Sequence, residues 1–523
     1  KNSMKTIKSS YEYIIIGSGF GGSFPAYQLA KAGKEVLVIE RGVWVKRDET
    51  CWDEYALHLQ EKPLYQGHTP YIVDQQGKPE HDWPYDTVGG MSTFYGAAAF
   101  RMRQQDFEGP PLPNTDKRNS QLAWPINYTT LSPYYDKAEE LQCVAGIKGQ
   151  DITEPPRKKD YPQKPPLQLS RPSQKIWDAA TQLGLHPFYI PMAINFTGKC
   201  NNTQCILCNT CDHYLCKIQA KNDLSVSVLP KAMKYGAVVL HNHRAVKINF
   251  AKNKAQSVDI INQETGQRLT IKCKYLIVAA GPIATPHLLL ASGIESISSA
   301  TQHIGHNLMR HINGVVSGVV PYIANPDNTL AKRVAIADYY FGDSSGKSLP
   351  KGNWGIIQDI ATPGKGVIKA NAPFGLKNIA ATFSMFLINQ LVIAEDIPQY
   401  DNRVYCASTN DVFGMPNIAI YHRYHSRDFA ARDALYKVAK RVLQKAGAKI
   451  FYYMPIVTFS HALGTCRMGS NRHLSAVNPE CRLWDITNCY ITDASVLPTG
   501  GSVNPSLTIA ANALRVADIM LKR

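Results

Sequence analysis

A histidine and an asparagine near the C-terminus are the residues whose chemistry suits catalysis. His461 opens the segment HALGTCRMG on a polar turn, and a neutral imidazole there can accept the proton of an alcohol near neutral pH. A histidine beside a Gly-Thr turn is more often a structural hydrogen-bonding residue, so its type alone leaves both roles open. Asn504 and Pro505 predict a helix start, with Asn504 as the N-cap and Pro505 at the first helical position. The positive end of such a helix stabilises negative charge.

Five cysteines lie close together, beginning with Cys200. The other four are Cys205, Cys208, Cys211 and Cys216. Their spacing is close to the C-x2-C-x2-C-x3-C of a ferredoxin, with one extra residue and no proline after the last cysteine. Three alternatives stay open: an iron–sulfur cluster on these four, disulfides or free thiols, or zinc, which would need two C-x2-C pairs set further apart. The remaining seven cysteines, Cys143 among them, are predicted to be buried thiols.

A βαβ unit at Tyr13–Glu40 is the first of the elements that must position this chemistry. Two short apolar runs flank the spacing G-x-G-x-x-G and a helical stretch, and the second run ends on Glu40. Gly17 permits the tight turn, Gly19 lets a pyrophosphate approach the backbone, and Gly22 lets the helix pack against the strand. The helix N-terminus can bind phosphates, and Glu40 can accept a hydrogen bond from a ribose hydroxyl. The unit predicts dinucleotide binding without saying which dinucleotide.

Two further segments suit the other half of such a ligand. Residues 87–108 begin with Gly89 and Gly90, and a glycine-rich segment there would let a flavin ring lie close to the main chain. The same residues equally suit a plain loop before a packed helix at Ala97–Ala99. A short apolar strand ends on Asp493, where a carboxylate can bind a sugar or ribityl hydroxyl.

Taken together, these motifs resemble those of the glucose-methanol-choline (GMC) oxidoreductases, a family of FAD-dependent enzymes. The resemblance covers most of the chain, and several motifs in one order are more specific than any single motif. The matching segments are Gly17 to Gly22 with Glu40, Gly89 to Ser92, Ala280 to Ile294, Ile304 to His311, HALGTCRMG at His461 to Gly469, DASVLPT and NPSLT.

The resemblance implies roles for single residues. His461, as a neutral base, would accept the hydroxyl proton of an alcohol while the carbon-bound hydride passes to flavin N5. Asn504 matches the second active-site position and would donate a hydrogen bond to the substrate oxygen. Asp493 matches an acid on the FAD ribityl chain, and Val246 matches a backbone contact to the adenine. His311 matches a motif histidine to which we assign no catalytic role.

The resemblance also places FAD contacts at glycine-rich turns and at strand and helix ends. The predicted cofactor-binding residues are Gly17, Gly19, Gly22, Glu40, Gly89, Gly90, Ser92, Val246, Ala280, Gly281, Asp493, Ala494, Asn504 and Pro505. The chain departs from the family after Gly90, because many members have Ser or Thr there, followed closely by Asn. This chain has Met91, Phe94 and Tyr95 instead, so we predict no covalent flavin link.

The length of 523 residues is too great for one compact core and predicts two domains. We expect an α/β protein with a Rossmann-like FAD-binding domain and a substrate domain on a mainly antiparallel sheet. The first would comprise residues 11–60, 225–312 and 455–523, and the second residues 61–224 and 313–454, with the cysteine segment. Predicted elements of the second are strands at Gly314–Tyr322, Ala380–Leu387 and Asn417–Tyr421 and a helix at Ser426–Ala446.

The formal net charge of +16 comes from basic residues that are interspersed with acids. This distribution indicates a solvated positive surface or attraction to acidic partners, anionic lipid or anionic substrate. It lacks the basic stripe with interleaved aromatics that nucleic-acid binding needs. The apolar stretch Tyr275–Ser292 is interrupted by Gly281-Pro282 and Pro286, so we predict no transmembrane helix and a soluble, cytoplasmic or periplasmic protein.

Several functions remain open from the sequence. The leading one is an FAD-dependent dehydrogenase of an alcohol, sugar or polyol that passes electrons to an acceptor other than NAD, such as a quinone or a partner subunit. A rival is an oxidase that uses oxygen and releases hydrogen peroxide. A non-catalytic flavoprotein electron-transfer subunit belongs to another class, and a nicotinamide enzyme is a further alternative.

Overall fold

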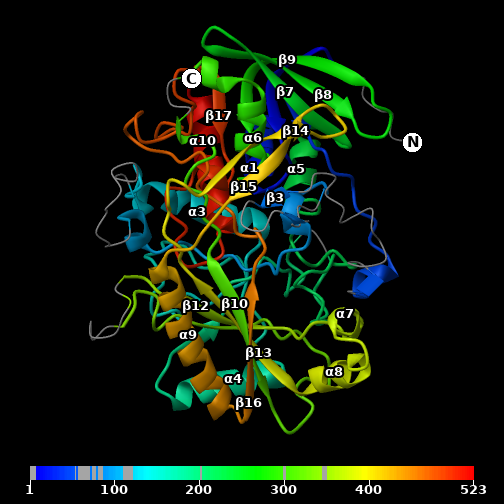
Figure 1. The fold of residues 1–523 in the computed structure, drawn as a ribbon, viewed down its shortest axis with the longest axis vertical. Coiled ribbons are helices and arrows are strands. Elements are labelled where there is room, and N and C mark those ends of the chain that lie inside the picture. Colours follow the sequence, from blue (N-terminus) through cyan, green and yellow to red (C-terminus); the bar gives the residue numbers. More distant parts are fainter. Residues whose placement is uncertain are drawn as a thin grey trace.

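The chain folds into two lobes stacked along its long axis (Figure 1). This computed structural model describes residues 7–53, 55–56, 71–73, 78–80, 86–109, 122–200, 203–298, 302–343, 350 and 352–523. A seven-stranded sheet forms the centre of the upper lobe, and a six-stranded sheet forms the centre of the lower lobe. Across these ranges, no helix combines the length and the apolar character that crossing a membrane requires.

The upper sheet joins strands from both ends of the chain. Its order is β6 (Val238–Leu240), β2 (Val36–Ile39), β1 (Ser10–Ile16), β9 (Arg268–Val278), β8 (Lys254–Asn262) and β7 (His243–Ala251), with β17 (Cys489–Ile491) also paired to β9. Strands β6, β2, β1, β9 and β17 run parallel, whereas β7, β8 and β9 form an antiparallel meander. The apolar run of β2 is buried throughout, as expected for a parallel strand covered on both faces.

Helices from distant parts of the sequence cover the upper sheet. They are α1 (Phe20–Lys31), α3 (Tyr128–Gln142), α5 (Val228–Lys234), α6 (Ala284–Ala291) and α10 (Ser506–Leu521). The C-terminal helix α10 contacts both α1 and α3, and most of its side chains are buried. The last helix of the chain therefore completes the lobe that the first strand begins.

The lower sheet is antiparallel at every pairing. Its order is β16 (Ile450–Ile456), β10 (Ile312–Val319), β13 (Leu387–Ala394), β12 (Gly355–Ile360), β11 (Val334–Ile336) and β5 (Pro187–Tyr189). Two helices pack against it, α4 (Arg171–Gln182) and α9 (Ser426–Lys445), while α7 (Lys365–Asn371) and α8 (Lys377–Phe383) connect β12 to β13. The predicted α/β fold, with a Rossmann-like domain and a second domain on an antiparallel sheet, is confirmed.

The predicted strand at Ala380–Leu387 is wrong. Helix α8 runs through Phe383, a 3₁₀ turn follows at Ser384–Phe386, and β13 begins only at Leu387. A short apolar run does not distinguish a strand from a helix by periodicity alone. The other three predicted elements of this domain correspond to β10, β15 and α9, with ends that differ by a few residues.

A third, four-stranded sheet was not predicted. It comprises β14 (Arg403–Asn410), β15 (Pro416–Tyr421), β3 (Tyr71–Val73) and β4 (Lys78–Glu80). Strands β14 and β15 contact α6 and lie with the upper lobe in space (Figure 1). The predicted division of the chain into two domains stays a prediction.

Candidate active site

His461 and His311 lie opposite each other across a short antiparallel pairing. Met309 and Leu463 form an antiparallel bridge, so the residue two positions after Met309, His311, lies opposite the residue two positions before Leu463, His461. The two imidazole Nδ1 atoms are 3.1 Å apart. The sequence had assigned no catalytic role to His311, and this contact makes it a direct neighbour of the candidate base.

The contacts of the two imidazoles assign their protons. His311 Nε2 lies 3.3 Å from the carbonyl oxygen of Gly500, which can only accept, so Nε2 of His311 carries the proton. Nδ1 of neutral His311 is then an acceptor, and Nδ1–H of His461 can donate to it at 3.1 Å, a shorter distance than the 3.5 Å from Nδ1 of His461 to Nδ2 of Asn313. Nε2 of His461 is left with a free lone pair, which is the form that a general base requires.

Burial, with smaller contributions from the neighbouring His311 and Lys332, lowers the pKa of His461 to about 3. Burial likewise lowers the pKa of His311. His461 itself keeps partial exposure to solvent, so access to it is retained. Both imidazoles are therefore neutral near pH 7, as the proton assignment requires.

Asn504 lies on the lone-pair side of His461. Its Nδ2 is 3.5 Å from Nε2 of His461, and its Oδ1 accepts a hydrogen bond from Nε2 of Gln358 on β12 at 2.8 Å. Gln358 thus holds the Asn504 amide with its N–H groups toward His461. The 3.5 Å contact is long for a hydrogen bond, so both groups remain free to bind a substrate hydroxyl.

Asn504 was predicted to be the N-cap of the last helix, and this is wrong by one residue. Helix α10 begins at Ser506 with Pro505 as its N-cap. The Asn504 side chain contacts Gln358 and His461 instead, and an amide engaged there is drawn away from the capping position. Ser506 Oγ donates to the Ala98 carbonyl at 3.2 Å, which ties this helix start to the segment after Gly89 and Gly90.

The two predicted glycine-rich segments meet through a serine that the sequence analysis overlooked. Ser18 Oγ donates to Glu40 Oε2 at 2.6 Å and accepts from the Gly89 amide at 2.8 Å. Ser92 closes the second segment, because its Oγ donates to the Gly89 carbonyl at 2.7 Å. A Cβ on Gly90 would come within 3.3 Å of the Gly19 Cα. The structure therefore brings the predicted residues of both segments together.

The three glycines of the first motif differ in what surrounds them. A Cβ on Gly17 would lie 2.3 Å from the Ala279 carbonyl oxygen, and Gly17 has a φ of +99°. A Cβ on Gly22 would lie 1.9 Å from the Gly17 carbonyl oxygen, whereas a Cβ on Gly19 would meet no atom within 4 Å. Gly17 and Gly22 are thus required by the fold, and Gly19 faces open space beside the N-terminus of α1. That space fits the pyrophosphate of a dinucleotide.

The Asp493 carboxylate connects the turns that follow strands β9 and β17, beside this space. Its Oδ2 accepts from the Gly281 amide at 2.9 Å and from Thr285 Oγ1 at 2.5 Å. Its Oδ1 accepts from the amide and the hydroxyl of Ser495, at 2.9 and 2.5 Å. Gly281, with a φ of +92°, has open space at its Cβ position. The carboxylate thereby fixes two turns that border the site.

Neighbouring backbone contacts join Asp493 to the remaining predicted residues. The Ala280 amide donates to Thr285 Oγ1 at 3.1 Å. The Ala494 carbonyl accepts from the Gly464 amide at 3.1 Å, which fixes the turn that carries His461. The cofactor half and the catalytic half of the predicted site are therefore in direct contact.

Val246 lies on β7 at a β-bulge, where the register with β8 shifts between Ala245 and Lys247. Its side chain is buried, and a bulged residue has backbone groups outside the regular ladder. The start of β7 is beside Glu40, because the His243 amide donates to the Glu40 carbonyl at 3.0 Å. This placement suits a backbone contact near the ribose end of the ligand.

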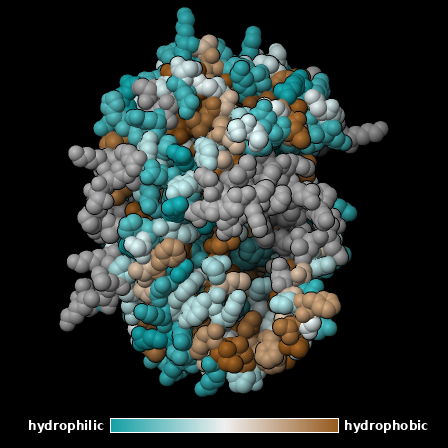
Figure 2. Space-filling model, in the orientation of Figure 1, coloured by the Kyte–Doolittle hydropathy of each residue, from teal (hydrophilic) through white to brown (hydrophobic). Residues whose placement is uncertain are grey.

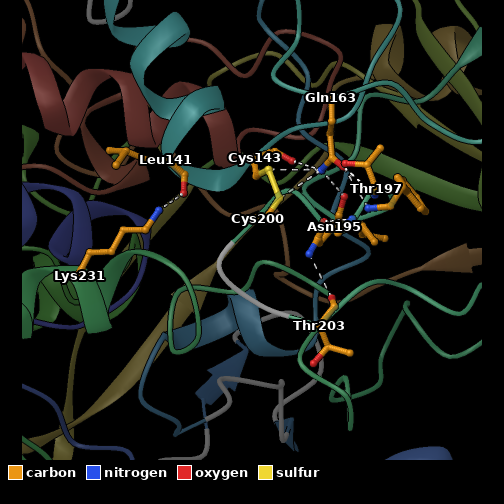
Figure 3. The surroundings of a disulfide bond; sticks show 11 residues. Leu141, Cys143, Gln163, Asn195, Thr197, Cys200, Thr203 and Lys231 are labelled. Carbon is orange, nitrogen blue, oxygen red and sulfur yellow. Dashed lines mark hydrogen bonds between the residues drawn. A yellow bond between two sulfur atoms is a disulfide. The ribbon is translucent and has the colours of Figure 1, made fainter.

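A disulfide bond joins Cys143 to Cys200 (Figure 3). The side chain of Gln163 braces it: Nε2 donates to the Cys143 carbonyl at 2.6 Å, and Oε1 accepts from Thr197 Oγ1 at 3.0 Å. The prediction that Cys143 is a free thiol is wrong. Its partner is 57 residues away in the sequence, and no spacing pattern reveals a pairing over that distance.

Four cysteines of the segment keep free thiols. They are Cys205, Cys208, Cys211 and Cys216. Burial raises the pKa of Cys205 to about 11 and that of Cys211 well above its ordinary value, so both thiols are protonated near pH 7 when no metal is bound. Within the ranges given above, no three His, Cys, Asp or Glu side chains form a group that could hold a metal ion. This arrangement does not fit an iron–sulfur cluster.

The cysteine segment contributes one partner of an ion pair whose charge acts on His461. Asp212 Oδ1 accepts from the buried Lys332 Nζ at 2.6 Å, and Lys332 is one of the charges that lower the pKa of His461. A Cβ on Gly96 would lie 1.7 Å from Asp212 Oδ1 and 2.1 Å from Lys332 Nζ. Nothing in the sequence pattern marks this pair, because its members are far apart along the chain.

Comparisons with known proteins identify the family and related enzymes. Models of a family described as GMC oxidoreductase match residues 86–313 and 398–513, and a model described as NAD(P)-binding Rossmann-like domain matches residues 15–43. The chain is 27% identical to paromamine 6'-oxidase from Streptomyces fradiae, over 97% of this chain and 90% of that protein. It is 26% identical to 2-methyl-1,2-propanediol dehydrogenase from Mycolicibacterium austroafricanum, over 99% and 97%.

A solved structure shows the same fold. The structure of a pyridoxine 4-oxidase superposes with a TM-score of 0.67 at 16% sequence identity, and the match covers 98% of this chain and 100% of the other. Because the match extends over nearly the whole of this chain, the fold is shared by both lobes.

The contrast between two glycines of the first motif generates a prediction. Gly19→Ala places its methyl group in open space, so we expect unchanged thermal unfolding of the cofactor-free protein and FAD affinity weakened by about tenfold or more. Gly22→Ala forces a methyl group against the Gly17 carbonyl, so we expect a lowered unfolding temperature. Thermal unfolding and fluorescence titration with FAD measure both effects. Normal FAD binding by Gly19→Ala would contradict the proposed pyrophosphate position.

The Gln358–Asn504 hydrogen bond generates a second prediction. In Gln358→Glu the carboxylate accepts instead of donating, which turns the Asn504 N–H groups away from His461. We expect kcat to fall by about 10- to 100-fold with folding retained. Gln390→Glu is the matched control, because it buries the same charge on β13 and Gln390 has no side-chain hydrogen-bond partner in the part of the chain described. Equal kcat in the two variants would exclude the orienting role of Gln358.

Proposed function

Because this chain belongs to the GMC oxidoreductase family, we propose that it oxidises the CH–OH group of an alcohol, sugar or polyol. The family and the enzyme class predicted from the sequence, an FAD-dependent oxidoreductase of the GMC type, are confirmed. The substrate class, the roles of single residues and the electron acceptor are proposals.

One observation carries the proposal. A lone pair on His461 Nε2 and an N–H of Asn504 face the same small space, 3.5 Å apart. A substrate hydroxyl between them donates to the lone pair and accepts from the amide, each at ordinary hydrogen-bond distance. No third side chain is needed to recognise a hydroxyl group in this way.

The chain's own groups then handle the proton. His461 Nε2 accepts the hydroxyl proton, while its Nδ1–H stays hydrogen-bonded to His311. Asn504 Nδ2 stabilises the negative charge that develops on the substrate oxygen, and Gln358 keeps that amide from turning. When bound, FAD supplies the acceptor of the hydride that leaves the substrate carbon.

The residues that would hold FAD are those already placed around the open space. The pyrophosphate would bind at Gly19 and the N-terminus of α1. The adenosine half would bind at Glu40 and the backbone of Val246. Gly89, Gly90 and the turn after β9 would border the ring and the ribityl chain. The open space at Gly19 and Gly281 supports this assignment.

Relatives support polar alcohols as substrates. Their names include a paromamine 6'-oxidase and a 2-methyl-1,2-propanediol dehydrogenase. An oxidase and a dehydrogenase both occur among them, so the proposed acceptor is a quinone, a partner subunit or oxygen, and not NAD. Rapid reduction of an artificial dye without peroxide would separate a dehydrogenase from an oxidase.

The role of His461 can be tested by substitution and pH together. Because the pKa of His461 is lowered to about 3, the base stays neutral through the range where an ordinary histidine, with a pKa of about 6.5, becomes charged. We expect no loss of the flavin reduction rate near pH 6.5, and a rate lowered by about 10²- to 10⁴-fold in His461→Ala. Stopped-flow absorbance of the oxidised flavin measures both.

FAD content and thermal unfolding of His461→Ala provide the control, since neither should change. Full turnover by this variant would exclude His461 as the base, and a rate that halves near pH 6.5 would exclude a neutral, buried imidazole.

For the cysteine segment we propose the disulfide and the free thiols, with no step that needs a metal. We expect iron and acid-labile sulfide far below cluster stoichiometry in anaerobically purified protein, because no three of the described His, Cys, Asp or Glu side chains form a group that could hold a metal ion. Elemental analysis and the visible spectrum measure this. Iron at cluster stoichiometry that disappears in Cys211→Ser would restore the iron–sulfur alternative.

A further inference from the structure

Helices α7 and α8 present large apolar side chains to solvent at one end of the lower lobe. The side chain of Phe374, in the turn between them, is 98% exposed, and Leu376, Ile379 and Phe383 are 51%, 55% and 55% exposed. Figure 2 shows apolar side chains gathered on this part of the surface, where Figure 1 places α7 and α8. Isolated apolar residues are normal on protein surfaces, but a contiguous patch indicates an interaction site.

The first residues of β16 extend this surface. Ile450 is 65% exposed and Tyr452 64% exposed. Val319 of β10 pairs with Ile450 on one side and with Leu387, just after α8, on the other, so β16 and the end of α8 are about two strand spacings, roughly 10 Å, apart. We call this surface the apolar pole. It consists of Phe374, Leu376, Ile379, Phe383, Ile450 and Tyr452.

The exposed charged residues of α7, of α8, of the last two turns of α9 and of the connection from α9 to β16 are basic. They are Lys365, Lys369, Lys377, Arg441, Lys445 and Lys449. The sequence contains no Asp or Glu in residues 360–394 or in residues 434–479. The chain as a whole carries a net charge of +16. An anionic surface is therefore complementary to this end of the molecule.

We propose that the apolar pole docks on a membrane surface that contains anionic lipid. The aromatic and aliphatic side chains would enter the boundary between headgroups and acyl chains, and the lysines would contact the headgroups. An apolar contact combined with basic residues gives firmer peripheral binding than either alone. Lysine favours lipid over a protein partner, because lysine is depleted in protein–protein interfaces and enriched on membrane-surface helices.

The docking surface is continuous with the sheet that carries Gln358. Strand β12 ends at Ile360, and α7 begins at Lys365. The contact with the membrane would therefore be made by the side of the lower lobe that carries α7 and α8 (Figure 1).

Flotation of the FAD-loaded protein with vesicles tests this proposal. We expect binding to vesicles of phosphatidylcholine with about one third phosphatidylglycerol, weak binding to phosphatidylcholine alone, and release by salt. The double variant Phe374→Ser, Phe383→Ser should lose about tenfold or more of its vesicle partitioning. The triple variant Lys365→Gln, Lys369→Gln, Lys377→Gln should lose the additional binding that anionic lipid gives. Its weak binding to phosphatidylcholine vesicles should not change.

Val412→Ser is the matched control, because Val412 is 88% exposed and lies in the turn between β14 and β15, outside the apolar pole. It should float like the unchanged protein, and all variants should keep turnover with a soluble alcohol, which shows that they are folded. Absence of vesicle binding by the unchanged protein, or equal binding by the double variant, would overturn the proposal. The proposal would also be overturned if the unchanged protein formed a dimer and bound no vesicles, while the double variant was a monomer. The apolar pole would then bind a second copy of the chain.

Discussion

The site depends on the pairing of strand β9 with a neighbour from each end of the chain. Val278, the last residue of β9, pairs with Ile16 of β1 on one side and with Ile491 of β17 on the other. Because the three strands are parallel, the segments that follow them leave the sheet at the same edge, where ligands of α/β proteins bind. Those segments carry the Gly17 turn, Gly281 and Asp493. With a different strand order, these three segments would lie apart from one another.

The arrangement of His461 and His311 depends on a second constraint, which is the supply of hydrogen-bond acceptors around two largely buried rings. A backbone carbonyl at Gly500 fixes the proton on His311, and the proton on His461 follows from it. Burial then keeps both rings neutral. Neither histidine needs a carboxylate partner to define its tautomer, in contrast to the Ser-His-Asp arrangement, where an acid orients the imidazole.

Local chemistry in the sequence predicted much of the fold and part of the site. Gly17, Gly19 and Gly22 have mechanical roles that depend on nearby residues, so their spacing was sufficient. His311 became a neighbour of His461, and Cys143 of Cys200, only through pairings between distant segments, which no local pattern contains. Gln358 was missed for the same reason. The strand predicted at Ala380–Leu387 failed because the exposed apolar face of α8 looks, in the sequence, like a buried strand.

The placement of β17 and α10 has a consequence for how the protein is made. The ribosome synthesises the chain from the N-terminus at about 5–20 residues per second, so β1 emerges roughly half a minute or more before the strand that completes its sheet. From its own synthesis until that of β17, β9 lacks its C-terminal neighbour, and α1 lacks the cover of α10 until the last helix is made. An unpaired strand edge and an uncovered apolar helix face are the surfaces that make an incomplete chain prone to aggregate.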